Sequence, residues 1–231
     1  SSAVKPEVCP DSSIKMLPIT VSKGSRVMIV QMPYDNLSDP KSKRDAPRIA
    51  FNKQYAAHHG YGYSTCPYLD MVSALDDMNS FRGHLIKPFC VYATMLANPE
   101  IEWVLLLDSD VVLNPSKFDQ SLDVFLNAAT PKTQMMCTNV PELDGCTGVG
   151  FFRISSLDSV CKWCDEVRGN RFGLWDQTAL WSVFLNLMGE PPTMRAAADQ
   201  QTDKSTPPAR ADAIWKTYWR TEQNKFRLKD S

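Results

Sequence analysis

Trp103-Val104-Leu105-Leu106-Leu107-Asp108-Ser109-Asp110-Val111-Val112-Leu113-Asn114-Pro115 is the stretch that decides the fold of this chain of 231 residues. An apolar run that ends in turn residues is typical of a buried strand in a parallel sheet. Side chains alternate along a strand, so the pattern predicts that Asp108 and Asp110 point the same way. Two carboxylates on one face repel each other unless a cation lies between them. The pair therefore predicts a Mg²⁺ or Mn²⁺ site that takes phosphate-bearing ligands, and two solvated acids at a strand end are the alternative.

Composition narrows the class of protein. Lys and Arg number 25 against 26 for Asp and Glu, so the chain has no basic surface for nucleic acid. No apolar stretch reaches the roughly 18 residues of a membrane-spanning helix, and an anchor that has been removed is left open. Seven cysteines favour a Golgi or other secretory lumen, and a cytoplasmic location stays open.

Strand and helix patterns alternate around the central stretch. Apolar runs predict strands at 26–32, 61–64, 134–140 and 151–154, and helical periodicity predicts helices at 48–59, 88–97, 122–126, 156–167 and 175–187. Pro40 and Pro47 predict a loop over 36–46. This alternation indicates an α/β fold with a mostly parallel central sheet flanked by helices. We expect an arm at 1–25, one domain at 26–188, a Pro/Ala-rich loop at 189–212 and a C-terminal helix at 213–231 packing on the domain.

A segment after the first predicted strand and a lysine at a predicted helix start are candidates to bind a ligand. The segment is a candidate because ligands in parallel sheets lie beyond the carboxyl ends of the strands. It consists of Pro33, Tyr34 and Asp35, and it either holds a base or ribose or forms an ordinary turn. The lysine is Lys87, which precedes Pro88 at a helix start. Lys87 either contacts a diphosphate, since helix N-termini favour anions, or is solvated.

Three later motifs are less specific. The glycine-dense segment 145–150 lets the backbone approach a ligand, but its spacing is not that of a dinucleotide fingerprint. Cys161 and Cys164 lie three residues apart on a predicted helix and could be a redox pair or half of a zinc site. Two plain helical cysteines, or one of them in a disulfide, are favoured over a metal site. Asp176 and Gln177 lie in the first turn of a helix, where an acid is stabilised.

Four of these stretches, in order, resemble the GT-A nucleotide-diphospho-sugar transferases, and more narrowly the galactosyl/xylosyl transferase family of mannan and xyloglucan enzymes. The similar segments are Asn52-Lys53-Gln54-Tyr55-Ala56-Ala57-His58-His59-Gly60-Tyr61, Lys87 with Asn98-Pro99-Glu100-Ile101-Glu102-Trp103 and Leu107-Asp108-Ser109-Asp110, Gly148-Val149-Gly150-Phe151-Phe152-Arg153, and Asp176-Gln177-Thr178-Ala179-Leu180.

The resemblance implies a GT-A fold and metal-dependent transfer of a hexose or pentose to a hydroxyl of a glycan acceptor, with retention of configuration. By the same resemblance the donor would be UDP-galactose or UDP-xylose, with GDP-mannose as the alternative. Asp110 and Asp108 would bind Mn²⁺ or Mg²⁺, and Asp176 with Gln177 would steady the sugar at the reacting centre. The donor would be bound by Pro33, Tyr34, Asp35, Lys87, Asp108, Ser109 and Gly150.

The sequence departs from that family at three points. Gly148 stands where the family has Asn, Trp175 precedes Asp176 where some relatives have a second Asp, and no histidine follows His84 to act as a late metal ligand. An inactive nucleotide-sugar-binding module therefore stays open as an alternative. An inverting transferase on the same fold is a second alternative. A phosphatase of the haloacid dehalogenase type is a third, because Leu106-Leu107-Asp108-Ser109-Asp110-Val111-Val112 resembles the motif of that family.

Overall fold

The computed structural model describes residues 25–32, 40–66, 83–140 and 143–168, together with residues 176, 179, 180 and 183. The chain divides into two compact units, Ser1–Cys161 and Lys162–Ser231, and each is described by itself. Of the predicted arm only Ser25 is described, and the predicted loop 189–212 and helix 213–231 lie outside the described residues.

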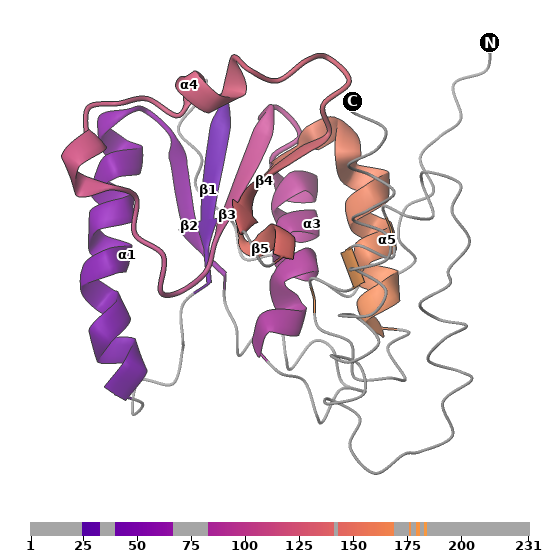
Figure 1. Ribbon diagram of the computed structural model, residues 1–231, viewed down its shortest axis with the longest axis horizontal. Helices are drawn as coiled ribbons and strands as arrows, with labels where there is room; N and C mark the ends of the chain where they lie inside the picture. The colour runs from indigo at the N-terminus through magenta and orange to yellow at the C-terminus, as the bar shows by residue number, and fades with distance from the viewer. Residues whose placement is uncertain are drawn as a thin grey trace. The chain divides into compact units, whose positions relative to one another are not determined.

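Helices and strands alternate along the first unit, as the sequence predicts (Figure 1). In chain order the elements are β1 (Val27–Gln31), α1 (Pro40–His58), β2 (Gly62–Thr65), α3 (Lys87–Ala97), β3 (Trp103–Leu107), α4 (Asp123–Leu126), β4 (Met135–Val140), β5 (Leu143–Arg153) and α5 (Leu157–Arg168), which crosses into the second unit. The α/β class is therefore confirmed.

The strands form one sheet in the order β2-β1-β3-β5-β4. β1 is parallel to β2 and β3, whereas β5 is antiparallel to both β3 and β4, so β5 alone of the described strands runs against the others. The predicted strand at 151–154 is only the end of β5, which begins at Leu143 and contains the glycine-dense segment. The prediction was too short because glycines lower strand propensity locally, whereas the ladders to β3 and β4 give these residues hydrogen-bond partners.

Both faces of the sheet are covered by helices (Figure 1). Alternate residues of β1 and β3 pack against Tyr55 and Ala56 of α1, and this side forms the core cluster of Val27, Ile29, Trp103, Leu105, Leu107, Leu122, Leu126 and Phe151. α3 packs on the opposite face, against β1 and β3, and is buried from Lys87 to Met95. Burial on both faces explains why β1 and β3 are apolar runs and not alternating ones.

Helix α1 corrects the loop predicted for 36–46. It begins at Pro40 and contains Pro47, so residues 40–46 are helical. Proline is compatible with the first turn of a helix, and an internal proline has a helical φ although it removes one hydrogen bond. The following turns bury Tyr55 and Ala56, and we attribute the continued helix to that packing. The predicted end is confirmed, since Gly60 has a φ of 71° just after the helix.

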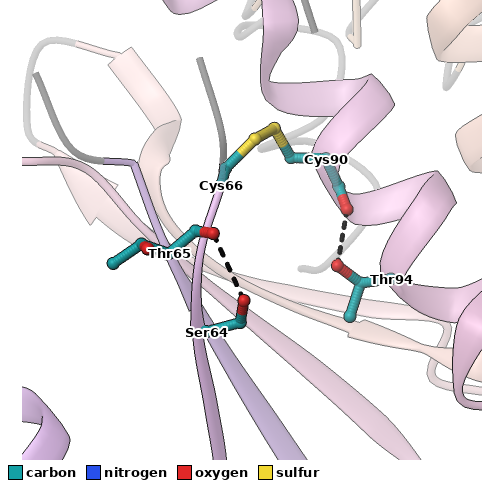
Figure 2. The surroundings of a disulfide bond; sticks show 5 residues. All are labelled: Ser64, Thr65, Cys66, Cys90 and Thr94. Carbon is teal, nitrogen blue, oxygen red and sulfur yellow. Dashed lines mark hydrogen bonds between the residues drawn. A yellow bond between two sulfur atoms is a disulfide. The ribbon is translucent and has the colours of Figure 1, made fainter. Parts of the chain in front are cut away.

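One disulfide ties the sheet to α3. Cys66, the residue after β2, is bonded to Cys90 in α3, and the two Cα atoms are 5.9 Å apart (Figure 2). Cys161 is in a disulfide too, and this is one of the two arrangements that the sequence favoured over a metal site in that motif. Within the part of the chain that the structure describes, no helix is both long and apolar enough to span a membrane.

Candidate functional site

The carboxyl ends of β2, β1 and β3 lie in one row of the sheet. Thr65 pairs with Gln31, and Gln31 pairs with Leu107, so the chain leaves all three parallel strands at the same edge. Two hydrogen bonds extend this row by one residue, from Met32 N to Leu107 O and from Cys66 N to Gln31 O, each 2.9 Å long. Asp108 is the next residue after β3, so it lies where ligands of parallel sheets bind.

Asp108 to Val111 form a turn, and this corrects the reasoning from strand alternation. β3 ends at Leu107, and the Val111 N–H donates to Asp108 O over 3.1 Å to close the turn. The strand rule therefore does not determine which way Asp108 and Asp110 point. Within the turn Ser109 is half-buried and Asp110 is exposed. Asp108 is anchored to the sheet as well, because its N–H donates to Gly148 O over 2.8 Å.

Lys87 pairs with Asp108 and not with solvent. Its ammonium group lies 2.9 Å from Asp108 Oδ1 and 3.0 Å from Oδ2. The Lys87 side chain is 8% exposed and that of Asp108 is 29% exposed. The prediction that Lys87 begins a helix is confirmed, since α3 starts there. A buried cation at the start of a helix places positive charge at the carboxyl edge of the sheet, where an anionic ligand is favoured.

The main chain of the same turn is held from the α1 face by buried side-chain amides. Gln31 Nε2 donates to Asp108 O over 3.2 Å and to Val111 O over 3.0 Å. Asn52 Nδ2 donates to Val111 O and to Gln31 Oε1, each over 3.0 Å, and Asn52 Oδ1 accepts from Leu113 N over 2.9 Å. Buried amides on the α1 face therefore hold the main chain of the turn, and Lys87 of α3 holds the Asp108 carboxylate.

Tyr63 completes this amide group by donating its hydroxyl to Gln31 Oε1 over 2.8 Å. Burial raises the pKa of Tyr63 above its ordinary value, so the hydroxyl stays protonated as a donor. The sequence reasoning gave Gln31 no role. The available signal was a polar residue at the end of the apolar run 27–30, since a buried amide needs partners.

For five of the predicted site residues the described structure gives no position relative to this edge. Pro33, Tyr34, Asp35 and Gln177 lie outside the described residues. Asp176 is buried and helical in the second unit, where its carbonyl accepts from Trp163 Nε1 over 2.7 Å. The roles predicted for these residues stay predictions.

Gly150 lies inside β5, where it pairs with Leu106 and Cys137. A Cβ atom at this position would lie 3.0 Å from Phe152 Cε2, so glycine leaves room for a buried ring. This packing explains why position 150 is a glycine, and the contact of Gly150 with the sugar donor stays a prediction.

The carboxylate oxygens of the turn are suitable ligands for a hard divalent cation. Asp108 and Asp110 supply carboxylate oxygens on one turn, and no group of three or more His, Cys, Asp or Glu side chains gathers to hold a metal among the described residues. Two protein carboxylates with the other positions left to phosphates and water are the usual arrangement for Mg²⁺ in nucleotide sites. The residues present therefore fit such an ion.

Comparison with known proteins identifies the enzyme class. The model of the galactosyl transferase GMA12/MNN10 family matches residues 23–140, which include α1, Lys87 and the Asp108–Asp110 turn. A search of curated proteins gave no match. Among solved structures, the fold is similar to that of a glycosyltransferase involved in the glycosylation of the major capsid of PBCV-1, with a TM-score of 0.55 and 16% identity over 71% of this chain and 79% of that chain. The chain therefore belongs to the galactosyl transferase GMA12/MNN10 family and is a glycosyltransferase.

Proposed function

We propose that this glycosyltransferase has a GT-A type fold and moves a hexose or pentose from a nucleotide-diphosphate sugar to a hydroxyl of a glycan acceptor, in a reaction that depends on Mn²⁺ or Mg²⁺. UDP-galactose and UDP-xylose are the first donors to test, and GDP-mannose is the next. The observation that carries this proposal is the Asp108–Val111 turn, which lies within the residues that match the family. It presents one exposed and one lysine-paired carboxylate at the carboxyl edge of the sheet.

The two aspartates have different roles in this proposal. Asp110 is exposed, so its carboxylate is available to bind the ion directly. Asp108 is oriented by the Lys87 ammonium group, and its oxygens share the ion or hold the donor ribose. When bound, a divalent cation stabilises the negative charge that develops on the diphosphate as the glycosidic bond breaks.

Lys87 and Ser109 would assist at the same edge. Lys87 adds a buried positive charge near the diphosphate, which favours the leaving group electrostatically. Ser109 lies between the two aspartates and offers a hydroxyl to the donor. We assign Pro33, Tyr34, Asp35 and Gly150 to donor binding on the family resemblance.

Retention of configuration is part of the proposal. In a retaining reaction no strong base has to deprotonate the acceptor, and Asp176 with Gln177 would steady the sugar and the positive charge that develops on it. An inverting reaction would need a carboxylate positioned as a general base. The Cys66–Cys90 disulfide supports an oxidising compartment such as the Golgi lumen, because disulfides persist there.

Thermal shift with a panel of donors tests the substrate class. We expect UDP-sugars, or GDP-mannose, to raise the melting temperature only when Mn²⁺ is present, since a ligand that binds the folded state stabilises it by mass action. A shift of equal size in excess chelator would contradict the metal requirement.

Replacing Asp110 tests the metal site. Asp110→Ala should abolish Mn²⁺-dependent transfer while the melting temperature without ligand stays within a degree or two, because the side chain is exposed. Asp119→Ala is the matched control, since Asp119 is a 92% exposed aspartate in the loop after the same turn. Wild-type activity in Asp110→Ala would overturn the assignment.

The anomeric configuration of the product, measured by NMR, tests retention. An α-linked donor should give an α-linked product, and a β-linked product would replace the retaining mechanism by an inverting one.

A further inference from the structure

The turn that carries Asp108 and Asp110 has its main chain fixed by side chains that are remote in sequence. Three main-chain atoms of the loop, Asp108 O, Val111 O and Leu113 N, are bonded to the amides of Gln31 and Asn52. Both amides are 0% exposed. Water therefore does not compete for these bonds, and an amide left unpaired here would be costly.

The hydrogen bonds determine the orientation of both amides. Gln31 Oε1 accepts from Tyr63 and from Asn52, so its Nε2 must face the carbonyls of Asp108 and Val111. Asn52 Oδ1 accepts from Leu113 N, so its Nδ2 must face Val111 O. Each polar atom has one arrangement that satisfies it, and such a network specifies a single geometry.

Asp110 depends on this network more than Asp108 does. The Asp108 carboxylate is held directly by Lys87. The exposed Asp110 carboxylate has no hydrogen bond or ion pair with the described residues, so its position follows from the main chain on either side of it. Residues 108 and 111, the first and last of the turn, are the ones whose carbonyl oxygens Gln31 and Asn52 hold.

We propose that Gln31 and Asn52, supported by Tyr63, are positioning residues that hold the Asp108–Val111 turn in the geometry required to bind the divalent cation and the donor diphosphate. This inference rests on the metal-dependent transfer proposed above. It places the control of metal affinity in β1, α1 and β2, outside the aspartate pair.

The expected loss of metal affinity can be estimated from what is known of other metal sites. Removing groups that orient metal ligands typically weakens metal binding about 10- to 100-fold. We expect Asn52→Ala, which removes bonds to Val111 and Leu113, to raise the dissociation constant of Mn²⁺ with UDP about 10-fold or more. Tyr63→Phe removes only the outer bond to Gln31 and should have a smaller effect in the same direction.

Asn98→Ala is the matched control that shows how a general loss of stability, without a change at the turn, affects metal binding. Asn98 is 2% exposed and donates its amide to Thr94 O over 2.8 Å at the C-terminal end of α3. It is therefore a buried asparagine whose loss should destabilise the fold without contact with the turn. It should lower the melting temperature and leave the affinity for Mn²⁺ with UDP within about twofold of wild type.

Two measurements on the full chain separate the possible outcomes. Amide hydrogen exchange reports whether the turn is loosened, because Leu113 N–H is bonded to Asn52 Oδ1 and should exchange at least about tenfold faster in Asn52→Ala. Calorimetry with MnCl₂ and UDP reports affinity. Faster exchange together with weaker binding, in Asn52→Ala but not in Asn98→Ala, is the expected result.

Faster exchange with unchanged affinity would overturn the positioning role and leave the proposed function intact. Equal loss of affinity in Asn52→Ala and Asn98→Ala would also overturn it, since the effect would then follow stability alone. If the wild-type chain binds no Mn²⁺ with any nucleotide, the proposed function fails, and the positioning role fails with it.

Discussion

Replacing Cys66 and Cys90 by alanine should lower the free energy of unfolding by about 3.5 kcal/mol. The two residues are 24 apart in sequence, and a cross-link across a loop of that length restricts the unfolded chain by this amount in the loop-entropy relation. Both positions are buried, at 3% and 1% exposure, so alanine adds no polar group that lacks a partner. For a chain of this size the loss corresponds to a fall in melting temperature of about 7–14 °C.

Binding at the proposed site should weaken as well, because Cys90 lies one helical turn after Lys87 in α3. The bond joins the start of α3 to the carboxyl edge of the sheet. Without it we expect faster amide exchange in the first turn of α3 and weaker binding of the donor with Mn²⁺. The change should be concentrated there, since the β1–β3 pairing does not involve the bond.

Urea unfolding of both single variants and the double variant provides the assay. Each single variant already breaks the bond, so the double variant should be destabilised as much as either single one and not by their sum. Reduction of the wild-type protein is a poor substitute, because Cys161 is also in a disulfide. A loss below about 1 kcal/mol, or additive losses, would refute the loop-entropy reasoning for this bond.

Two further predictions concern ion pairs. In a double-mutant cycle by urea unfolding, Lys87→Met and Asp108→Asn should show a coupling energy of about 1.5–3 kcal/mol, because a charge-assisted pair with little exposure is lost in either variant; a coupling below about 0.5 kcal/mol would contradict the pairing. The hydrogen bond from Arg26 holds the pKa of Glu102 below its ordinary value of 4.5, so the pair stabilises the fold above that pH and its contribution is lost as the pH falls through the lowered pKa. Melting temperatures should therefore be lower for Glu102→Gln than for wild type at pH 7. This difference should shrink as the pH falls below 4.5 and through the lowered pKa, and a difference that stays constant over this fall in pH would argue against the pair.

Local sequence patterns were sufficient for most elements of the first unit. The apolar runs at 27–31 and 103–107 form β1 and β3, Pro88 lies in the first turn of α3, and the short helix at 122–126 is α4. These patterns work because each signal lies within a few consecutive residues: a strand buried on both faces reads as a continuous apolar run, and the fixed φ of proline suits the first turn of a helix. Propensity failed at Pro47, where packing of the later turns of α1 outweighs one lost hydrogen bond.

The sequence by itself determined the alternating fold, the carboxylate pair after β3 and the family to which the motifs belong. Only the tertiary structure decided that Asp108 pairs with Lys87, that Gln31 and Asn52 hold the turn, and that Cys66 bonds Cys90. The reason is physical: periodicity records whether a side chain is buried, whereas the partner of a buried amide, charge or thiol depends on which distant strand or helix packs beside it. Strand order also depends on tertiary structure, since sheet pairing joins segments that are separated by tens of residues. The same is true of the turn at Asp108, because Gln31 and Asn52 hold it from distant elements.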